Sequence, residues 1–464
     1  MSIKKILLAT RPLTPPWDEA SKNFAYFLAK SIKDPELQMN ILTTPTTLDG
    51  LGDNVIAHPI FPLYDATRAG HSFSQKAILS SYLFTKSCKY DIVHYLFTPT
   101  VFNSRLIRFG NRLQGVISAK AGIQESTTSG NIPTKTFEML DSRLRGNDIQ
   151  KSSTQKESVR FKTIQTIATL REDLYGIDDW KKMFFADKLV VYSDYSKYKL
   201  EAAGFENVTR IYPGIDLNLY SPQPKDAETM KHFNITPEDF VIAYFGEYAR
   251  LGATDMLVEM LINHLKPNSQ NCHPELACLP DRQVSGSPFV QNYSESNGML
   301  KQVQHDSAHK NIKFIFACRV KNDADQKKKD EVMAKLTQAG IIDSVRFSDT
   351  FKDMPKLYNL TDIVLFPVEN MRGKFDIPLV IIEGYACGKP VIVSDLPIFK
   401  EFTNESISTI IPREDNGILW TKIIELKNDE VKRKALSVNA RAFVEQHFDL
   451  QNTAREYKKI YQSL

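Results

Sequence analysis

The stretch that decides the fold reads Gly373-Lys-Phe-Asp-Ile-Pro-Leu-Val-Ile-Ile-Glu-Gly-Tyr-Ala-Cys-Gly-Lys-Pro-Val-Ile-Val-Ser-Asp395. Pro378 favours the first position of a helix, where its missing N–H removes no hydrogen bond. The predicted helix runs through Glu383 and stops at Gly388, because glycine commonly ends helices. The apolar run 391–393 then predicts a buried strand. A loop, a short helix and a strand in this order indicate one repeat of an α/β sheet.

Similar repeats extend in both directions along the chain. Apolar runs predict a first series of strands at 6–9, 39–42, 55–60, 92–97, 164–170 and 189–192, and a second series at 241–245, 312–317, 363–366 and 390–393. Amphipathic stretches lie between these runs, which is typical of βαβ units in a doubly wound parallel sheet. The Pro-Gly turn and closing proline of residues 212–222 predict a linker. We therefore expect two α/β domains, at 1–222 and 223–440.

Two polar segments without periodicity interrupt this pattern, at about 115–158 and 268–309. Both resemble translated palindromic repeat elements, which occur as insertions in some bacterial reading frames. The resemblance implies that they are passengers, since lengthening a loop costs little free energy. The spacing of Cys272, Cys278 and His273 in the second segment matches no zinc pattern, so we expect no metal site there.

Composition places the chain among globular proteins. It has 464 residues, of which 42% are hydrophobic and 25% charged, with a formal net charge of +4. This charge is too small to indicate a nucleic-acid binder, but it allows peripheral contact with an anionic membrane surface. Five scattered cysteines without a CxxC pair fit a reducing cytoplasm. The apolar run near the first residue is too short for a signal peptide, and no stretch reaches the length of a membrane span.

The signature around Glu383 carries a family resemblance. Together with Ala386-Cys-Gly-Lys-Pro-Val-Ile392, it resembles the donor-binding motif of glycosyltransferase family 4, the retaining GT-B enzymes. The resemblance implies two Rossmann-like domains facing across a cleft, an N-terminal one for the acceptor and a C-terminal one for the nucleotide-sugar donor. It also implies a C-terminal helix, at 441–464, that packs back across the cleft. Glu383 is implied to bind the ribose hydroxyls, a role that suits a carboxylate with several acceptor sites.

The chain departs from this motif at its first glutamate, whose place Phe375 takes. The adjacent Asp376 is our predicted catalytic substitute, in contact with the donor sugar. The alternative, that Asp376 is a neighbour of the helix N-cap, stays open. The start of the helix, at Ile377, Pro378 and Leu379, is predicted to bind the anionic donor because open helix N-termini favour anions.

A second part of the resemblance concerns the donor diphosphate. Gly246 matches a glycine of the family, but the arginine that should follow it is Glu247, a reversal of charge. We expect Arg250 to replace a family lysine, and Lys374 or Arg319 to supply the lost positive charge. Each of these three cations also has a simpler interpretation as a solvated surface residue.

The N-terminal half matches the family less closely. A histidine that often ends the fifth strand of the family is absent, whereas His94 ends an earlier predicted strand. His94 either faces the cleft as a catalytic group or is a packed, hydrogen-bonded core residue.

The resemblance implies a bacterial enzyme that moves a sugar from a nucleotide-sugar donor to a glycan or lipid-linked acceptor, with retention of configuration. It implies work in cell envelope polysaccharide biosynthesis, in the cytoplasm or peripherally at the inner face of the membrane. We expect no cofactor and no metal, because cations and a helix start can stabilise the leaving phosphate. The losses at the positions of Phe375 and Glu247 leave an alternative open: a catalytically silent GT-B protein that binds a nucleotide-sugar or glycan as a partner subunit. A third alternative is a GT-B sugar-nucleotide epimerase, although the catalytic carboxylates and the histidine that such an enzyme needs cannot be assigned to residues of this sequence.

Overall fold

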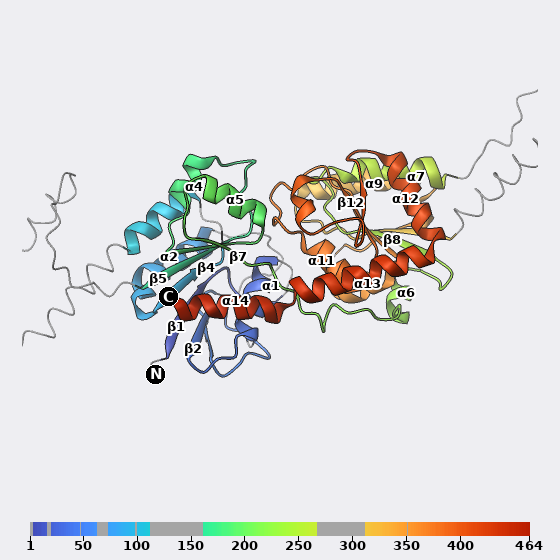
Figure 1. Cartoon of the computed structure of the whole chain (residues 1–464). Coiled ribbons are helices and arrows are strands. Elements are labelled where there is room, and N and C mark those ends of the chain that lie inside the picture. Colours follow the sequence, from blue (N-terminus) through green and yellow to red (C-terminus); the bar gives the residue numbers. More distant parts are fainter. Residues whose placement is uncertain are drawn as a thin grey trace, which may run out of the picture. The chain divides into compact units, whose positions relative to one another are not determined.

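The computed structural model describes residues 3–15, 20–46, 48–62, 73–97, 100–111, 161–266, 311–349 and 351–464. Both predicted insertions lie outside these residues. The chain forms two compact units, one made of Met1–Ile211 with Thr453–Leu464 and the other of Tyr212–Asn452 (Figure 1).

The division after Ile211 comes earlier than the boundary predicted near residue 222. The reason is that the proposed linker is hydrogen-bonded into the second unit. The N–H of Ile215 donates to the carbonyl of Phe448 at 2.9 Å, and the amide of Asn359 donates to the carbonyl of Ser221 at 3.0 Å. Residues 212–221 are therefore part of the second unit.

The first unit contains a seven-stranded sheet in the order β3-β2-β1-β4-β5-β6-β7. Every pairing in it is parallel. The strands are β1 (Lys4–Ala9), β2 (Leu37–Leu42), β3 (Val55–His58), β4 (Ile92–Tyr95), β5 (Lys162–Ile167), β6 (Lys188–Val191) and β7 (Val208–Arg210). The order reverses at β1, as in doubly wound folds, so the predicted architecture is confirmed.

Helices cover both faces of this sheet. They are α1 (Ala20–Ser31), α2 (Phe73–Lys86), the 3-10 turn η1 (Ser87–Lys89), a helix over 101–111, α4 (Ile177–Met183), α5 (Asp194–Ala202) and α14 (Leu450–Ser463). Successive side chains of a strand point to opposite faces. Thus Val93 of β4 packs in the cluster that contains α2, whereas His94 contacts α14. Figure 1 shows α2, α4 and α5 on one side of the sheet and α1 and α14 on the other.

The second unit contains a six-stranded sheet in the order β10-β9-β8-β11-β12-β13, again with only parallel pairs. The strands are β8 (Phe240–Tyr244), β9 (Ile312–Phe316), β10 (Val345–Phe347), β11 (Ile363–Phe366), β12 (Val391–Ser394) and β13 (Thr409–Ile411). Here the order reverses between β8 and β11. Ligands of open α/β sheets bind beyond the carboxyl ends of the strands at such a reversal.

The helices of the second unit are α6 (Ala227–His232), α7 (Ala253–Leu265), α9 (Asp323–Gln338), η2 (Ile342–Ser344), α10 (Met354–Leu360), α11 (Leu379–Ala386), η3 (Pro397–Glu401), α12 (Asn416–Asn428) and α13 (Glu430–His447). Figure 1 shows α7, α9 and α12 on one side of the sheet and α6, α11 and α13 on the other. Strands β8, β9, β11 and β12 are almost fully buried, as their continuous apolar runs predict.

The last segment of the chain differs from the single helix expected over 441–464. Its first part continues α13 to His447, and a break at Phe448–Asp449 precedes α14. From Thr453 on, α14 is counted with the first unit, where the hydroxyl of Tyr461 lies 2.7 Å from the Nδ1 atom of His94.

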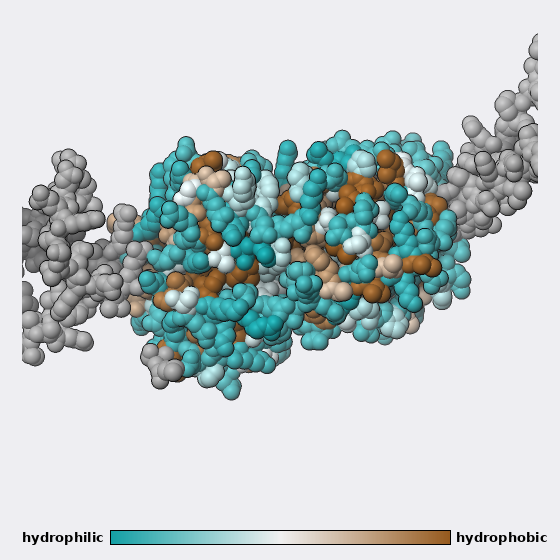
Figure 2. All heavy atoms as spheres, viewed as in Figure 1, coloured by the Kyte–Doolittle hydropathy of each residue, from teal (hydrophilic) through white to brown (hydrophobic). Residues whose placement is uncertain are grey.

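The surface is mainly polar on the face drawn in Figure 2, where hydrophobic residues show only in separate areas among hydrophilic ones. Within the described residues, no helix is both long enough and apolar enough to cross a membrane.

Candidate functional site

Glu383 lies in α11, on the side of the second sheet that also carries α10. The hydroxyl of Tyr358 donates to its Oε2 atom at 2.9 Å, and the hydroxyl of Tyr220 also donates to the carboxylate. The side chain is partly buried. Burial raises the pKa of Glu383 from 4.5 to about 7, although both tyrosine hydroxyls act in the opposite direction. Two tyrosine hydroxyls thus donate hydrogen bonds to a carboxylate that titrates near neutral pH.

Helix α11 begins at Leu379, one residue after the predicted first position at Pro378. Pro378 is the N-cap of α11, and no side chain caps the helix. Ile377 and Pro378 are buried, and Leu379 is partly buried, so this segment offers backbone groups more than side chains. An uncapped helix start carries partial positive charge. Anion binding by these three residues stays a prediction.

Asp376 precedes the N-cap by two residues and is 4% exposed. This position close to Pro378 agrees with the alternative interpretation of Asp376 as a neighbour of the helix N-cap. Its catalytic role stays a prediction.

Glu247 is the centre of a cluster of cations. Its carboxylate accepts two hydrogen bonds of 2.7 Å from Arg250, one of 2.7 Å from Lys321, and lies 2.8 Å from the amino group of Lys374. Burial alone would raise the pKa of Glu247, but the bonds from Arg250 and Lys321 and the charge of Lys374 hold it well below its usual range. The carboxylate is therefore ionised, and the four groups together carry a net positive charge.

The cluster lies at the reversal of strand order. Glu247 and Arg250 follow β8, Lys321 follows β9, and Lys374 follows β11. The structure thus brings together two of the three predicted cations, Arg250 and Lys374. Lys321 was missed in the sequence, although its place just after a predicted strand was a usable signal. The third, Arg319, lies on the same loop as Lys321, and its role in binding the diphosphate stays a prediction.

The two lysines are held close together. Their nitrogen atoms bond the same Oε1 atom at 2.7 and 2.8 Å, so they lie at most about 5.5 Å apart. At an effective dielectric constant of about 20, such a pair repels by about 3 kcal/mol, before screening by solvent. The lysine side chains are 30% and 24% exposed, which lowers this cost. The negative charge of Glu247 offsets the remaining repulsion.

Gly246 has a packing reason to be glycine. A Cβ atom there would lie 2.0 Å from the ring of Tyr244. The Tyr244 hydroxyl in turn bonds the backbone of Glu247, donating to its carbonyl at 3.3 Å. The glycine therefore lets a buried tyrosine support the loop that carries Glu247 and Arg250.

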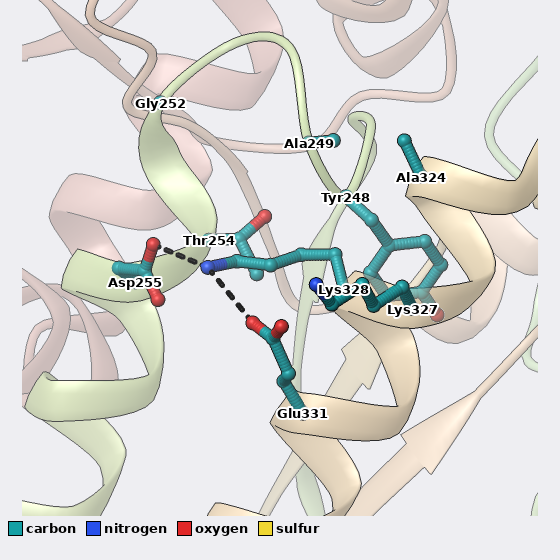
Figure 3. A pocket seen from close by; sticks show the side chains of 9 residues that line it. All are labelled: Tyr248, Ala249, Gly252, Thr254, Asp255, Ala324, Lys327, Lys328 and Glu331. Atoms are coloured by element: carbon teal, nitrogen blue, oxygen red, sulfur yellow. Dashed lines mark hydrogen bonds and ion pairs between the residues drawn. The ribbon is translucent and has the colours of Figure 1, made fainter.

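A pocket of about 220 Å³ adjoins this loop. Figure 3 shows Lys328 reaching across it from α9, with its amino group between two acids. These are Asp255 at 2.6 Å and Glu331 at 3.6 Å. Because these acids neutralise Lys328, the pocket itself does not favour an anion, in contrast to the cluster around Glu247.

His94 does not face a ligand site, so its predicted catalytic role is wrong. The side chain is 0% exposed, and both ring nitrogens have partners. Nδ1 lies 2.7 Å from the hydroxyl of Tyr461, and Nε2 lies 2.7 Å from that of Thr166. Burial lowers the pKa of His94 to about 3. The alternative interpretation, a hydrogen-bonded core residue, is the one that the packing supports.

Across the described parts of the chain, no group of three or more His, Cys, Asp or Glu side chains is arranged to hold a metal ion. Positive charge near the reversal of strand order comes from protein side chains.

Two solved structures share the fold over nearly the whole chain. Anabaena HepE, solved with UDP and glucose, superposes with a TM-score of 0.62 at 16% identity and covers 99% of this chain and 100% of its own. A glycosyltransferase from Rickettsia africae gives a TM-score of 0.60 at 14% identity, covering 99% and 98%. The chain has the GT-B fold.

Sequence comparisons agree with a GT-B protein. Residues 292–429 match the family model described as glycosyl transferases group 1, a range that includes Lys321, Lys374 and Glu383. The lipopolysaccharide core biosynthesis mannosyltransferase LpsB of Rhizobium meliloti is 22% identical over 259 residues, which are 55% of this chain and 61% of LpsB. The D-inositol 3-phosphate glycosyltransferase of Jonesia denitrificans is 24% identical over 280 residues, or 57% and 53% of the two chains. The matches therefore span only 53–61% of the length of these relatives.

Proposed function

We propose that this GT-B protein is a glycosyltransferase that moves a sugar from a nucleotide-sugar donor to a glycan or lipid-linked acceptor, with retention of anomeric configuration. The observation that carries the proposal is the meeting of three cations beyond β8, β9 and β11, beside the loop that leads to Glu383. Such a position at the reversal of strand order is where doubly wound sheets bind nucleotides. The group 1 match, which includes Lys321, Lys374 and Glu383, and the UDP in the HepE structure support it.

In this proposal each group has a separate role. Glu383 accepts hydrogen bonds from the ribose hydroxyls, and Asp376 contacts the donor sugar. Arg250, Lys321 and Lys374, together with the uncapped start of α11, neutralise the diphosphate. When the bond between the anomeric carbon and the diphosphate breaks, negative charge grows on the leaving oxygen, and preorganised cations stabilise it. The oxygen of the acceptor hydroxyl bonds to the anomeric carbon, and the leaving phosphate takes its proton, so neither a metal nor a cofactor is part of the proposal.

A donor panel tests this function. We expect calorimetric titration of the purified chain with UDP-, GDP- and ADP-sugars to give one donor that binds selectively, followed by slow release of its free sugar in the absence of acceptor. Binding without any sugar release over hours would favour the alternative, a silent GT-B partner subunit, for which Phe375 in place of the motif glutamate is the reason. No binding to any member of the panel would rule out the proposed donor site.

We also propose that the first unit contacts an anionic membrane surface, which fits a lipid-linked acceptor. The support is a surface formed by α2 and the helix over 101–111. Three phenylalanines are exposed on it: Phe73 at 88%, Phe102 at 74% and Phe109 at 58%. The two helices contain four basic residues, Lys76, Lys86, Arg105 and Arg108, and no acidic one. Exposed aromatic rings beside basic side chains are typical of interfacial membrane contact.

Vesicle flotation tests this contact. The chain is expected to float with vesicles that contain phosphatidylglycerol and to stay behind with purely zwitterionic ones. Changing Phe102 and Phe109 to serine together should weaken flotation at least about tenfold, since burying one phenylalanine contributes about 1.5–3 kcal/mol. The matched control changes Val431 and Val438, which are 82% and 61% exposed on α13, to serine. Equal loss in both double variants, or no loss in either, would contradict the assigned surface.

A further inference from the structure

The carboxylate of Glu247 lies beneath the cations that surround it. Its side chain is 5% exposed, whereas those of Arg250, Lys321 and Lys374 are 44%, 30% and 24% exposed. An anion that approaches from solvent therefore meets the cationic groups before it can reach the carboxylate. An anion bound there would contact these cations from the side opposite to Glu247 and would not compete with it for one position.

Each cation comes from a different loop. Arg250 precedes α7, Lys321 precedes α9, and Lys374 precedes α11. Neither lysine is near Glu247 in the sequence, and the bond from Lys321 spans 74 residues. The cations of the three loops thus all bind the carboxylate of Glu247.

We propose that Glu247 is a positioning residue: an internal counterion that holds Arg250, Lys321 and Lys374 together as one outward-facing seat for a diphosphate. Three positive charges and one negative charge leave the seat with a net charge of +2, which matches a diphosphate ester. This inference rests on the proposed function, because it explains how a chain with glutamate at the arginine position of the motif still offers positive charge there.

Removing the carboxylate has a definite consequence. Lys374 is surrounded by Glu247, Lys321 and Arg250, with the buried thiol of Cys318 nearby. Burial already lowers the pKa of Lys374, and Glu247 opposes this. Without Glu247, two cations and burial all disfavour the charged form of Lys374. The amine then loses its proton at lower pH and leaves the seat.

The first experiment requires no ligand. The rate at which the Lys374 amine is acylated by a small anhydride is followed against pH by mass spectrometry, since only the deprotonated amine reacts. In Glu247→Gln the midpoint should move at least about one pH unit lower than in the unchanged protein, and in Glu247→Asp by less. The matched control is Glu425→Gln, because Glu425 likewise binds two lysines, Lys422 and Lys432, but on α12 and α13. An unchanged Lys374 midpoint in Glu247→Gln overturns the proposal.

The second experiment titrates inorganic pyrophosphate by calorimetry between pH 7 and pH 9. The ratio of the variant's dissociation constant to that of the unchanged protein cancels the titration of the ligand itself. For Glu247→Gln this ratio should rise with pH across the range, because Lys374 in the variant loses its positive charge at lower pH than in the unchanged protein. For Glu425→Gln it should stay near one. Tighter binding by Glu247→Gln at every pH would show a carboxylate that competes with the anion, and would overturn the proposal.

The two proposals fail in distinguishable ways. If pyrophosphate binds as expected but no nucleotide-sugar does, the result supports the diphosphate seat and contradicts the proposed donor function. If nucleotide-sugars bind to Glu247→Gln with unchanged affinity and unchanged pH dependence, the result supports the donor function and contradicts the positioning role of Glu247.

Discussion

Replacing Glu383 by glutamine is expected to weaken donor binding about fiftyfold at pH 8, because hydrogen bonds to a charged group contribute about 1.5–3 kcal/mol. A carboxylate can accept from two adjacent ribose hydroxyls at once, whereas the amide of glutamine has one acceptor oxygen. Calorimetry with the donor selected by the panel measures the change. An affinity within about threefold of the unchanged protein would contradict the role given to Glu383.

The pH dependence makes the same prediction sharper. With its pKa raised to about 7, Glu383 is protonated in mild acid, so donor affinity should fall as pH drops below 7. Glu383→Gln should remove this part of the pH dependence. Tyr358→Phe removes a hydroxyl that lowers the pKa of Glu383, and should therefore move the fall in affinity to higher pH. If the pH midpoint of the fall in donor affinity does not change in Tyr358→Phe, the titrating group is not Glu383.

Stability should change in the opposite direction to binding. A carboxyl whose folded pKa lies above its unfolded value binds a proton more readily when folded. Its contribution to the free energy of unfolding is therefore largest in acid and is lost as pH rises from about 4.5 through 7. Glu383→Gln should raise the free energy of unfolding of the second unit at pH 8 by up to about 3 kcal/mol. Higher stability combined with lost binding is the signature of a ligand-binding residue, and a merely structural glutamate would lose both.

Changing His94 to leucine is expected to lower the free energy of unfolding of the first unit by about 2–3 kcal/mol, since the buried hydroxyl of Tyr461 loses its bond to His94 and that of Thr166 keeps only its bond to Tyr457. The buried Trp180 reports on this unit in denaturant titrations, and Trp420 reports on the other. Tyr461→Phe, which removes one hydroxyl, should cost about 1 kcal/mol. A loss seen at Trp420 but not at Trp180 would contradict the prediction.

The pH dependence of the first unit follows from the same residue. Burial lowers the pKa of His94 to about 3, below the ordinary value of 6.5. The unfolded chain therefore takes up a proton first as pH falls, and stability is lost progressively from about pH 6.5 towards 3. We expect His94→Gln to flatten this dependence at Trp180. The His94 term in the first unit and the Glu383 term in the second thus have opposite signs in acid.

The architecture could be predicted from local patterns. Apolar runs near Ile6, Val241 and Val391 are long enough to identify buried strands, because the side chains of a parallel strand face the core on both sides. The start of α11 was predicted to within one residue, since a proline is poorly tolerated inside a helix and marks its beginning. The short strands β7, β10 and β13 were not predicted, because three residues give too weak a pattern.

The sequence by itself determined the two doubly wound sheets and the residue types near the donor motif, because periodicity and turn chemistry act over a few neighbouring positions. Only the tertiary structure decided which side chains meet. It joined Lys321 to Glu247 across 74 residues, and it turned His94 towards α14. A histidine at a strand end faces a ligand or the core according to which element covers that face of the sheet. Charges that come from separate loops meet only once the strands before them are in register, and no local pattern carries that information.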